Sequence, residues 1–180
     1  HGVLGMTELL AAAPLPADQQ AQAAVLHGAV VSLKAIADDA LTVSTLQAGR
    51  LRLNVAPTDI RGMLQSLREL HLQDASRKGL GVECHADAGL HPAYLADESR
   101  LRQIIGNLVG NAIKFTQRGA ITLTVRLVGE DDGRARLKFS VTDSGPGLAP
   151  AFRQRAFDLF AQGPDSQGSV NGGVGLGLGI

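Results

Sequence analysis

The sequence lacks several features that would each assign it to a class of protein. With a single cysteine, Cys84, it has no internal disulfide framework, which fits a reducing compartment, and we expect that thiol to be half-buried and unreactive in a strand. Its 17 basic and 17 acidic residues balance, so no basic excess indicates a nucleic-acid partner. No apolar run reaches the roughly 18 residues that span a bilayer, so we expect no direct membrane contact in this chain. Aromatic residues make up 3% and tryptophan is absent, so the core must consist mainly of Leu, Val, Ile and Ala.

What the chain does contain is an amphipathic segment at 97–116, DESRLRQIIGNLVGNAIKFT, which predicts a helix capped by Asp97. Its expected core face consists of Leu101, Ile104, Ile105, Leu108, Ala112 and Phe115. Asn111 and Lys114 follow Asn107 at i+4 and i+7, so the three side chains lie within about 40° of Asn107 and roughly 100° from the apolar face. Amide oxygens suit a hard cation, and amide and ammonium groups suit phosphate oxygens. A plain solvated helix edge is the competing interpretation.

Two glycine-rich segments follow that helix, at 143–147 and 172–179. Asp143 should end a strand, where Gly145 and Gly147 let the backbone come close to a ligand and the carboxylate can accept a hydrogen bond from an exocyclic amine. By itself this motif is more often an ordinary turn. The second segment can offer backbone N–H groups to phosphates, and because no Gly-Lys-Ser/Thr follows, a P-loop fold is disfavoured.

Taken together, these segments resemble the nucleotide-binding boxes of sensor histidine kinases of two-component systems. NLVGNAIKFT resembles the asparagine box, DSGPGL the first glycine box, AFDLFAQ the phenylalanine box and GGVGLGLGI the second glycine box, in the family's order over 97–180. Upstream, GVLGMTELL and LQAGRLRLN resemble the two helices that precede the catalytic domain, especially in hybrid kinases.

The resemblance implies ATP and Mg²⁺ as cofactors. It assigns Asn111 to the metal, and Asn107 and Lys114 to the phosphates or the metal shell. It assigns Asp143 to the adenine amine. The other members of the implied ATP site come from the glycine and phenylalanine boxes: Gly145, Gly147, Phe160, Gly173, Gly175, Leu176 and Gly177.

The activity implied is that of an ATP-dependent protein-histidine kinase. Hydrolysing relatives such as gyrase and the ninety-kilodalton heat-shock chaperones typically carry a glutamate four residues before the metal-binding asparagine, and here that position is Asn107, whose amide cannot act as a general base. The γ-phosphate is therefore expected to pass to a histidine and then to a response-regulator aspartate. The acceptor histidine is expected upstream of His1, which is not itself the acceptor, so we expect no catalytic residue in this chain.

Two other functions stay open. The position usually held by Ser or Thr in the second glycine box is Val174, and the expected lid at 163–173 contains no Lys or Arg. Both departures favour a non-catalytic nucleotide-sensing or scaffold module. A hydrolysing ATPase of the gyrase and chaperone superfamily is the third possibility.

The expected organisation has three parts: a partial dimerisation and phosphotransfer hairpin at 1–48, a linker or first strand at 49–54, and a catalytic domain at 55–180 that is incomplete at its C-terminus. In the hairpin, helices at 2–13 and 18–48 flank a turn. Apolar residues of the longer helix recur in steps of three and four, which predicts a bundle seam covered by a second copy. They are Leu26, Ala29, Leu33, Ile36, Ala40 and Val43. The expected partners are thus a homodimer mate and a response-regulator receiver domain. We expect a cytoplasmic location, with membrane anchoring of a longer parent protein left open.

The expected catalytic domain is a two-layer α+β sandwich, which in the family is the Bergerat-type ATP-binding fold. A helix starts at Thr58 or Asp59 and ends near Arg77, with Ile60, Met63, Leu64, Leu67 and Leu70 buried. The expected strands lie at 50–55, 80–86, 120–128 and 134–142, the last two forming a hairpin, and a short helix lies near 150–157.

Overall fold

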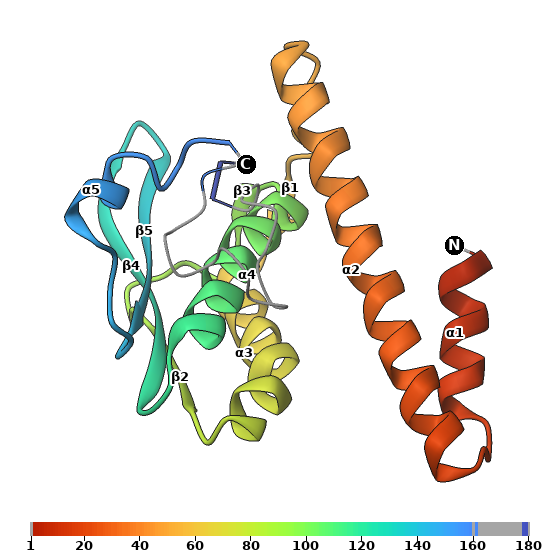
Figure 1. Cartoon of the computed structure of the whole chain (residues 1–180). Helices are drawn as coiled ribbons and strands as arrows, with labels where there is room; N and C mark the ends of the chain where they lie inside the picture. The colour runs from red at the N-terminus through yellow and green to blue at the C-terminus, as the bar shows by residue number, and fades with distance from the viewer. Residues whose placement is uncertain (1, 160, 162–177, 180) are drawn as a thin grey trace.

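The computed structural model describes residues 2–159, 161, 178 and 179. Figure 1 shows a helical hairpin followed by an α/β domain. The elements are α1 (Gly2–Ala12), α2 (Ala17–Gln47), β1 (Ala56–Thr58), α3 (Ile60–Arg77), β2 (Gly81–Ala86), β3 (Tyr94–Ala96), α4 (Glu98–Phe115), β4 (Ala120–Asp131), β5 (Arg134–Asp143) and α5 (Pro150–Arg153).

The hairpin of α1 and α2 forms as expected. The buried Thr7 donates to the carbonyl of Leu4 and lies 3.2 Å from Nδ1 of His27, which joins the two helices. The helix α2 ends at Gln47 with Ala48 as its C-cap, and Gly49 just after it has a φ of +63°, the left-handed conformation that favours glycine. Along α2 the expected seam is mostly exposed: Leu26 is 50%, Leu33 67% and Ile36 39% exposed.

The strand expected at 50–55 is wrong. The structure has no regular element at 51–55, and β1 begins only at Ala56, where it pairs antiparallel with β3. The segment 51–55 pairs with no strand in the described ranges, and the N–H of Asn54 instead donates to the carboxylate of Asp97. The alternation of apolar and polar residues at 50–55 therefore did not indicate a strand. The short strand β3 was not predicted from the sequence.

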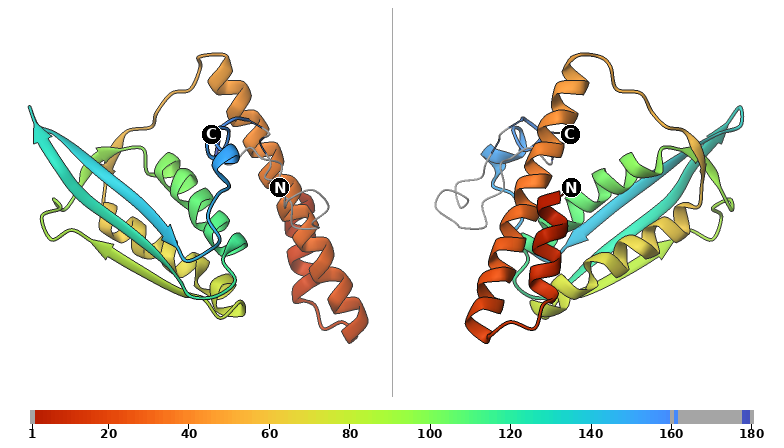
Figure 2. Two further views of the ribbon diagram at one scale, coloured as in Figure 1. Left: turned by 60° about the vertical axis from the view of Figure 1, so that its left-hand side comes forward. Right: turned by 90° about the vertical axis from the view of Figure 1, so that its right-hand side faces the viewer.

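The rest of the domain is the two-layer α+β sandwich that was expected. Its sheet has the order β2-β4-β5, with β2 parallel to β4 and β4 antiparallel to β5. Figure 2 shows α3 and α4 together on one face of this sheet. Because the sheet is mixed and its helices cover one face, each inward-facing residue of a strand meets a helix.

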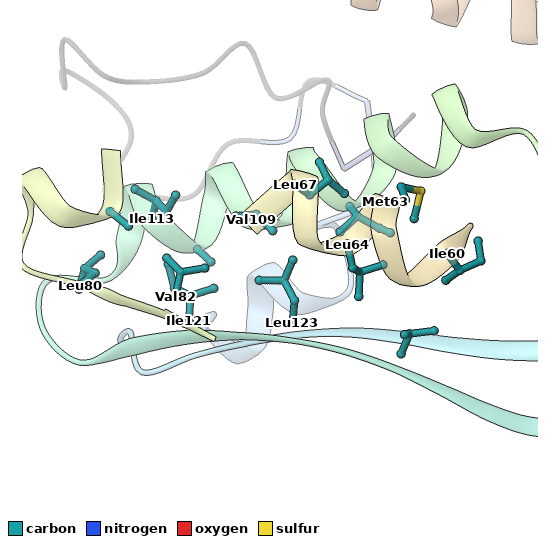
Figure 3. Packing of buried hydrophobic residues seen from close by; sticks show 14 residues of the cluster. Ile60, Met63, Leu64, Leu67, Leu80, Val82, Val109, Ile113, Ile121 and Leu123 are labelled. Atoms are coloured by element: carbon teal, nitrogen blue, oxygen red, sulfur yellow. The ribbon is translucent and has the colours of Figure 1, made fainter. Parts of the chain in front are cut away.

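The core lies between the two helices and the sheet (Figure 3). Its fully buried members include Ile60, Met63, Leu64, Leu67, Val109, Ile121, Leu123 and Val125. The assignment of three residues to the core was wrong: Leu70 is 70% exposed, and Ile104 and Phe115 are each 49% exposed. On α4 the buried stripe instead runs through Ile105, Val109, Ala112 and Ile113. The helix thus has a second apolar stripe, which includes Ile104 and Phe115, beside the buried one. The sequence analysis assigned that second stripe to the core.

The β4–β5 hairpin extends beyond the residues expected for it. Asp131 pairs with Arg134, and Asp132 and Gly133 form a two-residue turn with φ values of 47° and 70°. Positive φ at both positions is the type I′ geometry that matches the twist of the flanking strands. The ladder carries a bulge between Leu127 and Gly129.

Two smaller expectations can also be compared with the structure. Cys84 is half-buried on β2, and burial raises the pKa of its thiol, which agrees with an unreactive cysteine. The helix α5 is shorter than expected and ends at Arg153, while Phe157 is 70% exposed. None of the helices in the described ranges combines the length and apolar character needed to cross a bilayer.

Candidate functional site

The helix α4 is anchored at its first turn by Asp97, its N-cap. The Asp97 carboxylate accepts hydrogen bonds from the N–H of Asn54 at 2.8 Å, the hydroxyl of Ser99 at 2.8 Å and the N–H of Arg100 at 3.1 Å. These hydrogen bonds stabilise the charged carboxylate and so lower the pKa of Asp97, and the bond from Asn54 has the largest effect. The cap predicted from the sequence is confirmed, and it fixes where the rest of α4 lies.

The three polar residues of α4 lie on the side of the helix away from the core. Asn107, Asn111 and Lys114 are all half-buried. Measured against the stripe that is actually buried, they lie roughly 180° around the helix, and not roughly 100° as expected. The ammonium of Lys114 lies 5.0 Å from the centroid of the Phe115 ring, a cation–π contact.

The C-terminal end of α4 meets the end of β5 through Thr116 and Asp143. Thr116 is fully buried, and its hydroxyl donates to Oδ1 of Asp143 across 3.5 Å. The same oxygen accepts the N–H of Gly145 at 2.8 Å. No hydrogen bond to Oδ2 comes from the residues that the structure describes. One carboxylate oxygen thus fixes the Asp143 side chain, and the other can serve a ligand.

Gly145 occupies a position where a side chain does not fit. A Cβ there would lie 2.7 Å from Oδ1 of Asp143 and 3.2 Å from the hydroxyl oxygen of Thr116. Gly147 has a φ of +70°, in the left-handed region. A hollow of about 370 Å³ beside them is lined by Gln117, Arg118, Ser144, Gly145 and Pro146. A flat ligand edge can therefore come close to the backbone here.

Ser144 joins the glycine segment to the loop after α4. Its hydroxyl donates to the carbonyl of Arg118 at 2.8 Å and accepts the N–H of Ala120 at 3.2 Å. Between them Gly119 has a φ of +106°, and a Cβ at this residue would lie 2.2 Å from the Ser144 hydroxyl. The loop can pass this close to Ser144 only because residue 119 is glycine.

The structure brings together part of the predicted site. Asp143 and Gly145 contact the end of α4, and Asn111 and Asn107 lie about 7.5 and 13.5 Å from Thr116 along the helix axis. Five predicted residues lie outside the described ranges: Phe160, Gly173, Gly175, Leu176 and Gly177. Sequence analysis missed Thr116 and Ser144, although each directly adjoins a motif residue.

The donor set fits ATP better than it fits a protein-held metal cage. Within the described ranges, no three His, Cys, Asp or Glu side chains gather into a metal-binding group. Mg²⁺ commonly keeps several waters and binds through one or two protein oxygens together with substrate phosphates. An amide such as that of Asn111 suits that role. A second hollow, of about 340 Å³, lies at the opposite end of α4 beside Asp97 and contains none of the predicted site residues.

Comparisons with known proteins agree with this geometry. Residues 96–180 match the family described as "Histidine kinase-, DNA gyrase B-, and HSP90-like ATPase". The aerobic respiration control sensor protein ArcB of Escherichia coli (strain K12) is 32% identical over 181 residues, which cover 100% of this chain and 23% of ArcB. The sensory/regulatory protein RpfC of Xanthomonas campestris pv. campestris is also 32% identical, over 100% of this chain and 25% of RpfC.

Among solved structures, full-length ShkA in complex with AMPPNP is similar over 99% of this chain and 36% of its own, with a TM-score of 0.75 and 39% identity. The chain spans about a quarter of the length of ArcB and RpfC.

Proposed function

Because the chain belongs, through residues 96–180, to the family of histidine kinase-, DNA gyrase B- and HSP90-like ATPases, we propose that it is the ATP-binding catalytic region of a sensor histidine kinase. It binds Mg-ATP and presents the γ-phosphate to a histidine on a bundle helix, for relay to an aspartate of a response-regulator receiver domain. The observation that carries the proposal is the cluster of Thr116, Asp143 and Gly145 at the end of α4.

Asp143 is the residue that selects adenine. Its Oδ1 is engaged by Thr116 and Gly145, which holds the carboxylate in one orientation and leaves Oδ2 to accept a hydrogen bond from the adenine amine. Gly145 and Gly147 form the floor on which the base lies. Guanine has a carbonyl in place of that amine and would meet a carboxylate that cannot donate, so the site should discriminate against it.

The phosphates lie along the polar stripe of α4. Lys114 supplies an ammonium to the phosphate oxygens and Asn111 supplies an amide oxygen to Mg²⁺, while Asn107 completes the metal or phosphate shell. Mg²⁺ held there would neutralise charge on the phosphate oxygens, and the residues of the protein contribute mainly by positioning. Because Asn107 is an amide, no general base at this position activates water. The P–O bond to the β-phosphate therefore breaks as a P–N bond to the acceptor histidine forms, and ADP leaves. The glycine box at 172–179 completes the phosphate site in this proposal.

The helical hairpin serves as the dimerisation part. The exposed apolar side chains of α2 need a partner surface, and a second copy of the same helix supplies a matching one. We place the receiver domain on this bundle, next to the acceptor histidine. The division into 1–48, 49–54 and 55–180 and a cytoplasmic location belong to the same proposal.

The test is phosphotransfer from labelled ATP to a phosphorylatable helix pair, with three versions of the chain. The unaltered chain and Asn54→Ala should both label the histidine, since the Asn54 side chain is exposed and only its backbone N–H is engaged. Asn111→Ala should lose labelling by about a hundredfold or more. Label on histidine that survives Asn111→Ala would refute the role of Asn111.

Two further results separate the other functions. Calorimetry with an ATP analogue and Mg²⁺ that detects no binding would favour a scaffold module. Steady release of phosphate without an acceptor would favour a hydrolysing ATPase.

A further inference from the structure

The end of α4 has carbonyl groups that the helix itself does not satisfy. At Thr116 the backbone turns out of the helix, with a ψ of 130°, although its N–H still reaches the carbonyl of Ala112. In a continuing helix the carbonyls of Ile113 and Lys114 would accept the N–H groups of residues 117 and 118. These residues lie beyond the end of the helix, so their N–H groups do not reach the two carbonyls. They lie at the negative end of the helix dipole, where a cation is favourable.

A lysine from another helix fills this position. The ammonium of Lys78 donates to the carbonyl of Ile113 at 2.8 Å and to that of Lys114 at 2.9 Å. Lys78 is the C-cap of α3, and its backbone is fixed by a turn in which Gly79, with a φ of +70°, donates to Ser76 and Leu80 donates to Ala75. The lysine is thus held by one helix end while it caps another.

The capped turn is the one that carries the candidate site. Lys114 itself is one of the two residues whose carbonyls are capped, and Thr116, which holds Asp143, comes two residues later. A loose last turn would change the direction of the Lys114 side chain and the distance from Thr116 to Asp143 together.

From this arrangement we propose that Lys78 is a positioning residue of the nucleotide site, acting through the last turn of α4 without touching the ligand. The inference rests on the proposed function, because it assigns Lys78 to the site formed by Lys114 and Asp143. It predicts that loss of the ammonium weakens nucleotide binding, and that it also loosens one turn of one helix.

The test compares Lys78→Met, which keeps the aliphatic stem, with Arg77→Met. Arg77 is the neighbouring cation on the same helix end, but it pairs only with the exposed Asp74 at 3.2 Å. For Lys78→Met we expect about tenfold weaker binding of a non-hydrolysable ATP analogue by calorimetry, the factor that corresponds to about 1.4 kcal/mol. We expect less than a twofold change for Arg77→Met, and recovery of most of the affinity in Lys78→Arg.

Amide hydrogen exchange supplies a readout that does not need a nucleotide. In Lys78→Met the amides of Phe115 and Thr116 should exchange about tenfold faster, while those of Ile105 and Val109 stay unchanged. Asp59→Ala, which removes the cap at the other end of α3, serves as a variant destabilised elsewhere and should retain affinity at temperatures where it is folded.

Equal affinity of Lys78→Met and the unaltered chain, with unchanged exchange at Thr116, would overturn the inference and leave the proposed function standing. An affinity loss of the same size in Arg77→Met or Asp59→Ala would also overturn it. Failure of the unaltered chain to bind the analogue is measured first and would instead overturn the proposed function, and the inference with it.

Discussion

The N–H of Asn54 donates to Oδ2 of Asp97 across 2.8 Å, and this bond ties the segment that leaves the helical hairpin to the N-cap of α4. The same carboxylate caps α4 through Oδ1. One side chain thus sets both the start of the site-bearing helix and the path by which the chain enters the domain. A substitution at Asp97 should therefore disturb both the start of α4 and the path of the segment that contains Asn54.

We expect Asp97→Ala to lower the free energy of unfolding by more than Asp59→Ala does. Both aspartates cap helices, but Asp59 accepts only the N–H of Gly62, whereas Asp97 also holds Asn54 and Ser99. Loss of a cap alone costs about 1 kcal/mol, which is our expectation for Asp59→Ala. Urea unfolding of the two variants measures the difference, and equal losses would contradict the linking role.

The stability that Asp97 provides should depend on pH in the acid range. Hydrogen bonds to the carboxylate hold its folded pKa below the ordinary value of 3.8. The contribution is therefore fully present above pH 3.8 and is lost as the pH falls through the lower folded value. We expect the gap in urea midpoint between the unaltered chain and Asp97→Asn to be constant from pH 7 to about 5 and to shrink towards pH 3. A gap that grew on acidification would contradict the assignment.

Thr116→Val should weaken nucleotide binding, because the hydroxyl that holds Oδ1 of Asp143 is removed while the side-chain shape is kept. We expect a loss of affinity of about five- to tenfold and a loss of stability of about 1 kcal/mol. Thr58→Val is the matched control: Thr58 is also buried, and its hydroxyl lies within hydrogen-bonding distance of the carbonyls of Ala56 and Ala96, far from the site.

Calorimetry and thermal unfolding of both threonine variants separate the two effects. If Thr58→Val lost affinity to the same extent, the effect of Thr116→Val would reflect stability and not the orientation of Asp143.

Gly119→Ala should be far more damaging than Gly133→Ala. Both glycines have positive φ, so each substitution meets backbone strain of about 1 kcal/mol. A Cβ at 119 would also collide with the Ser144 hydroxyl at 2.2 Å, whereas nothing lies within 4 Å of one at 133. We expect about 2 kcal/mol more destabilisation at 119, because the bonds of Ser144 are lost as well. Thermal unfolding checks this, and similar losses at both positions would show that the loop relaxes freely.

Charges placed on the seam of α2 should prevent self-association. Leu33 and Ile36 lie on the apolar seam, and we expect Leu33→Lys with Ile36→Lys to convert a dimer into a monomer in sedimentation experiments. Ala35→Lys adds a charge to the same helix at an exposed position well away from the seam and should leave the dimer intact. A dimer that survives the double variant would place the interface elsewhere.

The sequence was most informative where a local physical rule determines the structure. Asp97 was identifiable as a cap, and the cap of α3 was narrowed to Thr58 or Asp59, because a capping side chain binds the backbone next to it. The hairpin of the last two strands was also predicted, and its turn lies at Asp132 and Gly133. Periodicity was less decisive on α4, which carries two apolar stripes. Only the shape of the sheet decides that Val109 faces the core and Ile104 does not.

The remaining features depend on residues distant in the chain. The three-residue strand β3 exists only because β1 lies beside it. The bond from Thr116 to Asp143 spans 27 positions, and those from Lys78 to α4 span 35 and 36. A threonine at the end of the asparagine motif, where the helix ends, is a signal that could have identified Thr116. No comparable pattern marks a lysine that caps another helix.

The type I′ turn at Asp132 and Gly133 offers a practical consequence. Figure 2 shows the β4–β5 tip extending past the helical layer, and Asp143 is the tenth residue of β5 from that tip, roughly 30 Å of extended chain away. An epitope or a fluorescent protein inserted between these two residues would lie at the tip of the paired strands, remote from Asp143. The hairpin should thus accept a reporter in living cells without disturbing the proposed nucleotide site.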